Sequence, residues 1–313
     1  MNNFKYSNTN KRYYTLDFYF KERFNTKVGR IPINGGFTCP NIDGTTGFGG
    51  CTFCSIKGSG DYAGTRKEDL LDQWDNGKIM MLKKWKDAKF IAYFQAFSNT
   101  YAPVEVLKEK FEVFVEKEEC LGISIGTRPD CLEDDVVEYL ADLNKRTNLI
   151  VELGLQTIHD ETSILFNRGH DTACFVEGVS KLRKHNIEVV VHIINGLPKE
   201  TEEMMLDTVK FVSKMDIQGI KIHLLHVMSD TKLVNQLNNG FLELMERQNY
   251  IELVVKQLDY LREDIVVHRL TGDAPKENFI GPFWSRRKVT VLNDIDKLQA
   301  DLNTFQGRLY DSI

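Results

Sequence analysis

Residues 35–64 read GGFTCPNIDGTTGFGGCTFCSIKGSGDYAG and hold three of the chain's six cysteines, Cys39, Cys51 and Cys54. Three thiolates in a single loop suit an iron–sulfur cluster, because soft sulfur ligands select such clusters over hard cations. A cubane cluster normally takes four cysteines, so a set of three leaves one iron open to bind another molecule. The nine glycines of this stretch allow the backbone to wrap closely around a cluster and direct N–H groups at its sulfurs.

Other interpretations of the three cysteines stay open at this point. A structural zinc site needs a fourth ligand at short spacing, and no further Cys or His lies between Cys54 and Cys120. A disulfide with one free thiol is disfavoured because nothing marks the chain as secreted, and unligated thiols are the third possibility. The intervals of eleven and two residues are not the short pattern most often associated with cluster chemistry, so the cysteines alone favour a cluster without establishing it.

Length and composition are those of an ordinary globular protein. The 313 residues are 42% hydrophobic and 27% charged, which suits one large α/β barrel or two modest domains. The start, MNNFKYSNTNKRYY, has no apolar core of the signal-peptide type, and stretches such as 187–197 are too short to span a bilayer. We therefore expect a cytoplasmic protein with no membrane segment. Cys120, Cys131 and Cys174 are isolated in the sequence, which favours packing roles over a second cluster.

The charge of the chain is unevenly distributed. The net charge is −5, yet residues 1–36 carry seven basic side chains against Asp17 and Glu22, a local balance of +5. Seven tyrosines and phenylalanines interleave with these charges between residues 6 and 24. This mixture suits contacts with nucleic-acid phosphates and bases. The alternative, a helix that packs its aromatic residues on the core and leaves its lysines in solvent, explains the pattern equally well.

Beyond the cysteine loop, apolar strand-like runs alternate with amphipathic helical stretches at intervals of roughly 30 residues. The strands are expected at 30–37, 89–97, 121–127, 148–155, 187–194 and 217–225, and the helices at 67–86, 104–117, 133–145, 171–185 and 200–214. This order predicts an α/β fold with parallel, right-handed βαβ units, and six units fit a partial (β/α)6 barrel of the TIM type. An open doubly wound sheet is the alternative, but no GxGxxG follows the first strand.

Three segments are expected along the chain. A basic and aromatic segment, 1–29, precedes a (β/α)6 core, 30–240, and an extension, 241–313, packs on that core. The extension is expected to contain a helix up to residue 263, a short strand at 265–270 and a stretch rich in Gly and Pro at 271–284.

Polar residues recur where the predicted strands end, which is where parallel barrels build their active sites. A single buried Glu152 or His192 would more simply be a hydrogen-bonded core group, but five such strand ends favour a site. They are 95–100, 127–130, 152–157, 192–198 and 221–226. The segment 167–170, NRGH, fits either a helix end with a glycine stop or a cation beside an anionic ligand.

The cysteine loop, ELGLQT (152–157), NRGHD (167–171), IINGLPKET (193–201) and HRLTGDAP (268–275) together resemble radical S-adenosylmethionine (SAM) enzymes. The resemblance runs from about residue 13 to residue 292 and is to the branch related to the catalytic subunit of Elongator, specifically its short bacterial relatives of the YtqA/YhcC type. It implies a [4Fe-4S] cluster whose open iron is chelated by SAM. One-electron reduction of SAM then gives a 5′-deoxyadenosyl radical that abstracts hydrogen from the substrate.

The resemblance also implies roles for individual residues. The cluster would be held by Cys39, Cys51 and Cys54, and SAM by a set of residues at the strand ends. In that set, the methionine amino group would be held by Gln95, Ala96, Phe97 and Ser98, and the methionine carboxylate by Arg168. The ribose would be held by Glu152 or Gln156. Phe53 would lie near the adenine, whose edge would be contacted by Asn195, Gly196, Leu197 and Pro198.

The family branch is associated with conversion of the 5-carboxymethylaminomethyl group of tRNA wobble uridine to 5-aminomethyl. The resemblance therefore implies tRNA as the substrate and a flavodoxin- or ferredoxin-type protein as the electron donor. The N-terminal basic segment and Arg286-Arg287-Lys288 are the expected tRNA contacts. Two alternatives are a radical enzyme acting on a small molecule in cofactor or porphyrin metabolism, and a non-catalytic cluster or haem carrier with the same fold.

Overall fold

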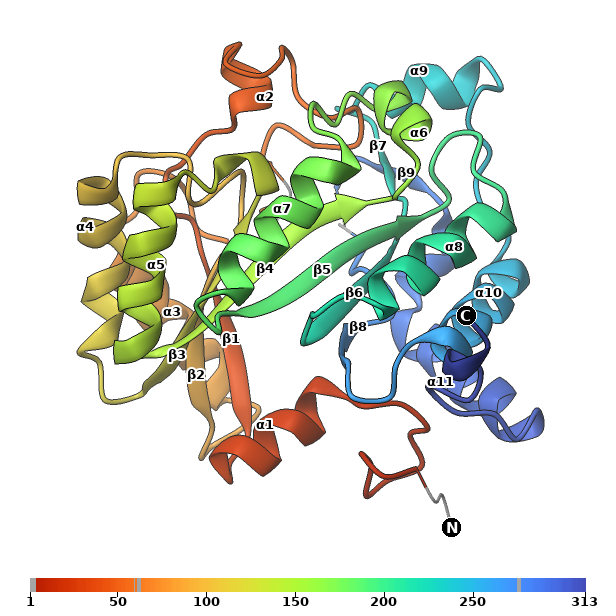
Figure 1. Ribbon diagram of the computed structural model, residues 1–313, viewed down its shortest axis with the longest axis horizontal. Helices are drawn as coiled ribbons and strands as arrows, with labels where there is room; N and C mark the ends of the chain where they lie inside the picture. Colours follow the sequence, from red (N-terminus) through yellow and green to blue (C-terminus); the bar gives the residue numbers. More distant parts are fainter. Residues whose placement is uncertain (1–3, 59, 61–62, 275–276) are drawn as a thin grey trace.

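The computed structural model describes residues 4–58, 60, 63–274 and 277–313, and its main feature is a parallel seven-stranded sheet curled into a half-barrel (Figure 1). The strands stand in the order β1-β2-β3-β4-β5-β6-β8. Their bounds are β1 Val28–Ile33, β2 Lys89–Phe94, β3 Cys120–Thr127, β4 Asn148–Gln156, β5 Glu188–Asn195, β6 Gly219–Leu224 and β8 Val266–Arg269. A separate antiparallel pair is formed by β7 Val227–Met228 and β9 Phe279–Gly281.

Helices connect the strands and cover the outer face of the sheet, as right-handed βαβ units require. From α3 onward, the helices are α3 Leu70–Leu82, α4 Val104–Val115, α5 Asp134–Arg146, α6 Asp160–Leu165, α7 Thr172–Arg183, α8 Glu202–Ser213, α9 Leu233–Asn238, α10 Arg247–Tyr260 and α11 Lys288–Asp301. Of these, α9 lies beside β7, and α11 packs on α10. The outward-facing strand residues and the inner helix faces form the main apolar core. None of the helices in the described part of the chain is both long enough and apolar enough to cross a bilayer.

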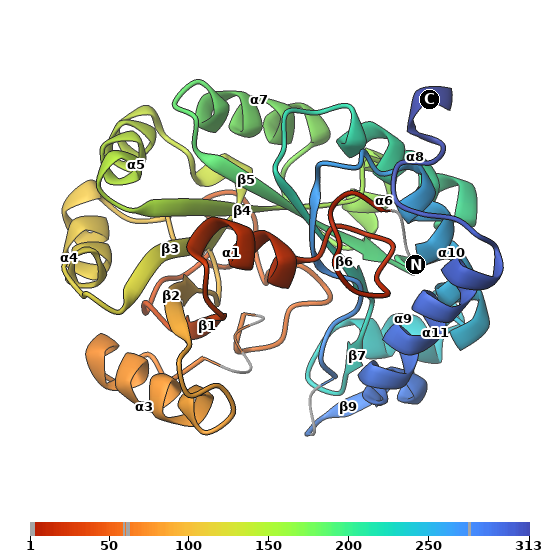
Figure 2. The ribbon, with the colours of Figure 1, turned by 90° about the horizontal axis from the view of Figure 1, so that it is seen from below.

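One end of the half-barrel is closed by α1, Leu16–Phe24, which is seen lying across the sheet in the view from below (Figure 2). Thr15 caps this helix by accepting a hydrogen bond from the main chain of Phe18. The buried Phe20 packs against the apolar residues that point inward near the start of the strands, Ile91, Ile150 and Val190. This end is therefore a packed apolar plug.

The barrel interior becomes polar two residues further along each strand. Every second residue of a strand points inward, so this is the next inward-facing layer. The next layer holds Tyr93, Glu152 and His192, and the layer after it Gln95, Gly154 and Ile194. The interior thus passes from an apolar plug to a polar middle and then to an opening at the C-terminal strand ends.

The predicted partial α/β barrel is confirmed, and it contains one strand more than the six predicted units. The short strand expected at 265–270 in the C-terminal extension joins β6 in parallel as β8. The second strand ends at Phe94 instead of 97, because Ala96 and Phe97 leave the extended conformation with φ of 82° and 60°. The last residue but one of the 268–275 motif, Ala274, is described, while Pro275 lies outside the described residues.

The basic N-terminal segment lies at the plugged end, and many of its charges are paired within the chain. Lys11 contacts Asp296, Lys27 contacts Asp17, Arg23 contacts Glu188, and Arg30 reaches Glu152 inside the barrel. This arrangement favours the packing interpretation of the segment over its interpretation as a tRNA contact.

Candidate active site

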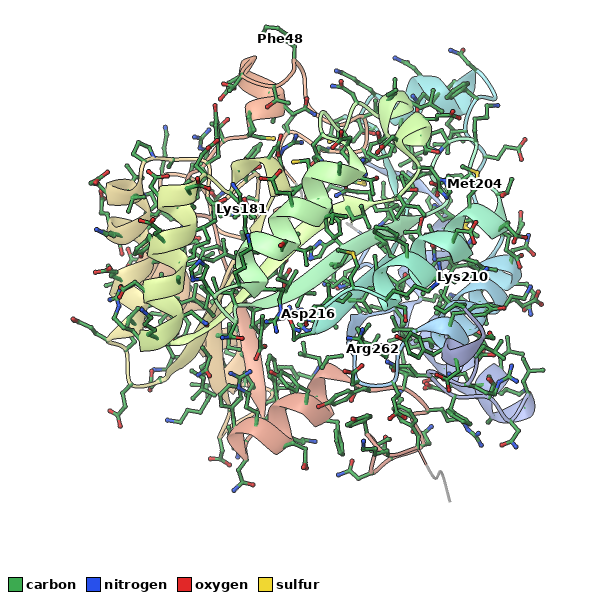
Figure 3. The ribbon with its side chains drawn as sticks, viewed as in Figure 1. Phe48, Lys181, Met204, Lys210, Asp216 and Arg262 are labelled. Carbon is green, nitrogen blue, oxygen red and sulfur yellow. The ribbon has the colours of Figure 1, made fainter. Side chains whose placement is uncertain are left out.

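Cys39, Cys51 and Cys54 line one wall of a cavity of about 330 Å³ at the C-terminal ends of the strands. Cys39 directly precedes the short helix α2, Pro40–Asp43, and the other two cysteines follow the glycine-rich turn after it. The tip of this loop carries Phe48, which projects into solvent at the top of the molecule with 79% of its surface exposed (Figure 3). None of the six cysteines, all of which are described, forms a disulfide.

The loop is attached to the segment after α6 by a set of hydrogen bonds. The fully buried Asn41 donates its amide to the carbonyl of Asn167 at 2.6 Å, and the Asn167 amide donates to the carbonyl of Gly50 at 2.8 Å. Gly169 has φ of +80°, and a Cβ there would stand 2.8 Å from Oδ1 of Asn41. The NRGH segment therefore holds the cysteine loop in place, and Gly169 is required for the close approach.

Arg128, at the end of β3, brings a positive charge to the cysteines. Its guanidinium binds both oxygens of Asp130, at 2.8 and 2.6 Å, and donates to the carbonyl of Arg168 at 2.7 Å. The hydrogen bond with Cys54 and the charge of Arg128 lower the pKa of Cys51, although burial of the thiol alone would raise it. A lowered pKa favours the thiolate form that binds iron.

The cysteines do not form a site for a single ion. Within the described ranges, no group of three or more His, Cys, Asp or Glu side chains converges as one metal ion would require. This finding disfavours the structural zinc site and is consistent with thiolates that each bind a different iron of a cluster. Burial raises the pKa of Cys120, Cys131 and Cys174, as expected for thiols that serve packing.

The loop after β2 places Gln95, Ala96, Phe97 and Ser98 on the cavity wall. The positive φ angles of Ala96 and Phe97 are uncommon for residues other than glycine, and such strain persists where the surroundings impose it. The main-chain N–H groups of Phe97 and Ser98 donate to the carbonyls of Gly58 and Thr38, so the loop is bound to both flanks of the cysteine stretch.

Two further predicted residues, Phe53 and Gln156, also line the cavity. The Phe53 ring lies 5.5 Å from that of Phe166. Gln156 has φ of 64°, and its buried Oε1 has no hydrogen-bond partner in the protein. A buried acceptor without a partner is costly, so a ligand hydroxyl at this position would compensate for it.

Arg168 is placed at the site but serves the protein fold. Its guanidinium donates to the carbonyls of Leu155, Thr157 and His170 and to Asp160, at 2.6 to 2.8 Å, and the residue is 1% exposed. Four of its five N–H groups are thus occupied, which leaves one donor at the cavity, and the assignment of Arg168 to the SAM carboxylate stays a prediction. Arg128 keeps more unoccupied donors at the cavity.

The segment from Asn195 to Pro198 is not among the described residues that line the cavity. Asn195 and Gln257 of α10 exchange two amide hydrogen bonds of 2.9 Å, and Leu197 packs in a small apolar cluster. Gly196 turns with φ of +86°. Asn195 thus attaches α10 to the end of β5, and the role of these four residues at the adenine edge stays a prediction.

Glu152 is also bound within the protein. Its carboxylate accepts from Arg30 at 2.9 Å, Ser124 at 3.0 Å and His192 at 2.8 Å, and it contacts Nζ of Lys221. Burial alone would raise its pKa, but the cations Lys221 and Arg30 and the His192 bond hold it well below its ordinary value. Both oxygens are engaged, so Gln156 is better placed than Glu152 for the ribose.

The match with protein families decides what kind of site this is. The family model of the Radical SAM superfamily matches residues 44–212, and the model of the Radical_SAM C-terminal domain matches residues 217–299. The chain belongs to the radical SAM superfamily. Its cofactors are accordingly a [4Fe-4S] cluster and S-adenosylmethionine, and the recognition made from the sequence is confirmed.

Relatives place this radical SAM protein in the branch related to Elongator complex protein 3. It is 54% identical to the uncharacterized protein YtqA of Bacillus subtilis, over 100% of this chain and 97% of that protein. It is 32% identical to YhcC of Escherichia coli K12, over 88% of both chains. The tRNA uridine(34) acetyltransferase of Methanocaldococcus infernus is 26% identical over a segment that covers 51% of this chain and 30% of that protein.

Solved structures confirm the radical SAM fold. The Elp3 of Methanocaldococcus infernus superposes with a TM-score of 0.66 at 16% identity, over 91% of this chain and 67% of that chain. SuiB of Streptococcus suis, bound to S-adenosylmethionine, gives a TM-score of 0.50 at 15% identity, over 81% and 53%.

The residues present fit both cofactors of the family. Three thiols share one cavity wall with a guanidinium beside them, which suits a cluster. The orphaned Oε1 of Gln156 and the strained 95–98 loop on the same cavity supply polar groups for a bound SAM. Cys39, Cys51 and Cys54 would hold the cluster, and residues 95–98 and Gln156 would hold SAM.

The sequence predicted no role for the far side of the cavity, although 221–226 is one of the polar strand ends. Tyr93, His223, His226, Arg269 and Asp273 all line that side. The signal was present in the HRLTGDAP motif and in the two histidines after β6, but only the position of β8 beside β6 shows that these segments meet.

Proposed function

We propose that this radical SAM enzyme converts the 5-carboxymethylaminomethyl group of tRNA wobble uridine to 5-aminomethyl. The observation that carries the proposal is the sequence similarity to the archaeal tRNA uridine(34) acetyltransferase across half of this chain. Since the matched segment covers 30% of that protein, we propose the wobble uridine as the shared substrate and do not propose acetyl transfer.

When bound, the cluster and SAM supply a 5′-deoxyadenosyl radical that abstracts hydrogen. The residues of this chain orient the ligands and exclude water, which is the protein's general contribution to cofactor chemistry. Gln156 accepts from the ribose, and the 95–98 loop binds the methionine amino group with main-chain and side-chain oxygens. Arg128 lies beside the cysteines and offers N–H donors to the carboxylate.

The cavity has room for a substrate group beyond these residues. It continues from the cysteine wall to Tyr93, His192 and Arg269, which lie on inward or rim positions of β2, β5 and β8. A modified base extruded from its loop would enter here, as RNA bases in single-stranded loops do in other recognition sites.

An aromatic and basic surface stands at the edge of this cavity. The Arg286 guanidinium lies 5.1 Å from the ring centre of Phe279 and 5.5 Å from that of Phe283, which is 63% exposed. Lys288 binds Asp273, a cavity residue, at 2.7 Å. Arginine and exposed aromatic side chains of this kind bind phosphates and stack on bases, so we place the tRNA contact here and not at the plugged end.

The proposal is tested by mass spectrometry of tRNA nucleosides from a strain that lacks the gene. Nucleosides built on 5-carboxymethylaminomethyluridine should accumulate, and those built on 5-aminomethyluridine should disappear. An unchanged profile, in a strain without a redundant enzyme, would refute the tRNA substrate. Accumulation of a small-molecule intermediate would then favour the alternative substrate class, which suits the net charge of −5.

The site of tRNA contact is tested with two pairs of charge variants. Arg286→Gln with Arg287→Gln should weaken tRNA binding and flatten its salt dependence, because phosphate contacts release counterions. Lys21→Gln with Lys27→Gln removes the same charge from the plugged end and should leave both properties unchanged. The reverse pattern would move the tRNA contact to the N-terminal segment.

A further inference from the structure

The recess between β6 and β8 has the composition of an anion site. His223 and His226 follow one another around the end of β6, and the Thr271-Gly272-Asp273 turn lies against both. A Cβ on Gly272 would stand 3.4 Å from Cε1 of His226 and 3.9 Å from Nδ1 of His223. The two imidazoles therefore flank one main-chain turn, and both line the cavity.

Both imidazoles keep a ring nitrogen without a partner. The Nε2 atoms of His223 and His226 are shielded from solvent and form no hydrogen bond within the protein. A native structure pairs most of its buried polar atoms, so two such atoms on one cavity wall indicate a missing ligand. Burial, followed by the charge of Arg269, lowers the pKa of His226 to about 4, so the ring is neutral at pH 7 and can donate to a ligand from Nε2 in the tautomer that carries its proton there.

The charge of the recess favours an anion. Arg30, Lys221, Arg269 and Lys288 lie in and around it, against the carboxylates of Glu152 and Asp273, so basic side chains outnumber acidic ones by four to two. Arg30 and Lys221 are both engaged by Glu152, and Lys288 is engaged by Asp273. Arg269 is less firmly held, since it stands 3.5 Å from Asp273. It is thus the cation best placed to bind a ligand.

We infer that Arg269, His223 and His226 form a subsite for a substrate carboxylate. The identification of this carboxylate as the carboxymethyl end of the modified uridine rests on the proposed function. Arg269 binds the carboxylate as its ionic partner, and the two imidazoles donate to it. A phosphate dianion fits less well, because Arg30, Lys221 and Lys288 are already engaged by Glu152 and Asp273, which leaves Arg269 as a single cation against two negative charges. The recess and the cysteine wall belong to the same cavity, so the remainder of the side chain can extend toward the SAM residues.

The test uses the reconstituted holoenzyme with SAM bound and two small probes that contain no uridine. N-methylglycine keeps the amine and carboxylate of the side chain, and N-methylethanolamine replaces the carboxylate with a hydroxymethyl group. Equilibrium dialysis of labelled probes should show N-methylglycine binding about tenfold more tightly, a difference typical of one charge-assisted contact. Equal binding of the two probes would overturn the inference.

Variants then assign the contact to its residues. Arg269→Gln should reduce N-methylglycine affinity about tenfold and leave N-methylethanolamine unchanged. Lys210→Gln, which removes a charge from α8 on the outer side (Figure 3), should change neither affinity. His226→Phe removes no native Nε2 bond, so it should fold as the parent does and weaken N-methylglycine severalfold. Parental N-methylglycine affinity in both Arg269→Gln and His226→Phe would refute the subsite.

Two further measurements distinguish failure of the carboxylate subsite from failure of the proposed tRNA substrate. Inorganic phosphate should displace N-methylglycine less effectively than acetate, and more effective displacement by phosphate would overturn the choice of a carboxylate. Conversion of tRNA from the deletion strain is measured in parallel. Carboxylate binding that depends on Arg269, in an enzyme that does not convert this tRNA, would support the subsite and refute the wobble-uridine substrate.

Discussion

The side-chain amide of Asn41 donates a hydrogen bond of 2.6 Å to the main-chain carbonyl of Asn167, and so joins the cysteine loop to the segment that follows α6. The same amide lies 3.6 Å from Sγ of Cys51. Because glycine-rich loops are intrinsically mobile, an attachment of this kind reduces the entropy lost when the three cysteines bind a cluster. Asn41 is thus a positioning residue for the metal site.

Asn41→Ala should lower the stability of the apoprotein by about 1–3 kcal/mol, since it leaves buried carbonyls without a donor. It should also speed the loss of iron to a chelator from the reconstituted protein. Urea unfolding and chelator kinetics measure the two effects. Asn144→Ala is the matched control, because Asn144 is only half-buried and makes only longer bonds of 3.4 and 3.5 Å. Equal iron loss in the two variants would contradict this role of Asn41.

Gln156→Asn should weaken SAM binding roughly tenfold, because the shorter amide cannot reach the same acceptor position, while Asn tolerates the positive φ at this residue. Stability should stay close to that of the parent, since Oε1 has no partner to lose. Equilibrium dialysis of labelled SAM with the reconstituted protein measures the affinity.

Arg168→Ala should behave in the opposite way. It removes donors from three carbonyls and from Asp160, so it should destabilise the apoprotein by several kcal/mol, on the order of the cost of unpaired buried groups. A fully stable Arg168→Ala protein with a selective loss of SAM affinity would support the carboxylate role expected from the sequence.

The buried His192 should make the free energy of unfolding depend on pH. Burial, followed by the Lys221 charge, lowers its pKa in the folded protein to about 4, whereas the unfolded value is about 6.5. Between these two values the unfolded chain binds a proton that the folded protein does not, so stability falls as the pH decreases from 6.5 to 4. The slope contributed by this group is at most about 1.4 kcal/mol per pH unit.

His192→Asn should reduce that slope while it keeps a donor for Glu152. His185→Asn, on an exposed turn, is the control and should not change the slope. Urea unfolding of the apoproteins at several pH values between 4.5 and 7.5 provides the comparison. Identical slopes in the parent and in His192→Asn would contradict a neutral His192.

Single replacements of Cys39, Cys51 and Cys54 by Ala should abolish the uptake of about four irons per chain, the content of one cubane cluster. Cys120→Ala and Cys174→Ala should leave the iron content near that of the parent, because these thiols are separate from the cavity. Iron analysis and visible absorbance after anaerobic reconstitution distinguish the two groups. Retention of zinc without visible absorbance would contradict the cluster.

Much of the fold follows from local patterns in the sequence. Runs such as LIVEL and VVVHII mark buried parallel strands, and their alternation with amphipathic helices predicts the barrel. The short strand β8 could be located near 265–270, but its pairing with β6 depends on long-range packing of the extension, which periodicity does not report. The helix expected up to residue 263 begins in the structure only at Arg247, as α10, and the short helix α9 before it was not predicted.

The candidate site was only partly predictable. Cysteine spacing identifies the cluster ligands because soft-metal chemistry restricts the residue types. Strand-end position does not distinguish a residue that faces a ligand from one that binds its own protein. Arg168 and Asn195 both end on main-chain or amide partners, a difference that arises from side-chain direction and from contacts with α10 and residues 155–160. The recess of His223 and Arg269 required the meeting of two segments more than 40 residues apart.

We expect the cavity to cleave SAM in order to modify a wobble uridine. The most direct measurement is formation of 5′-deoxyadenosine by the reduced, reconstituted enzyme, supplied with SAM and tRNA from the deletion strain. 5′-Deoxyadenosine should form in step with loss of the 5-carboxymethylaminomethyl nucleoside, and Cys51→Ala should produce neither change. Enzyme with about four irons per chain that forms no 5′-deoxyadenosine with this tRNA would contradict it.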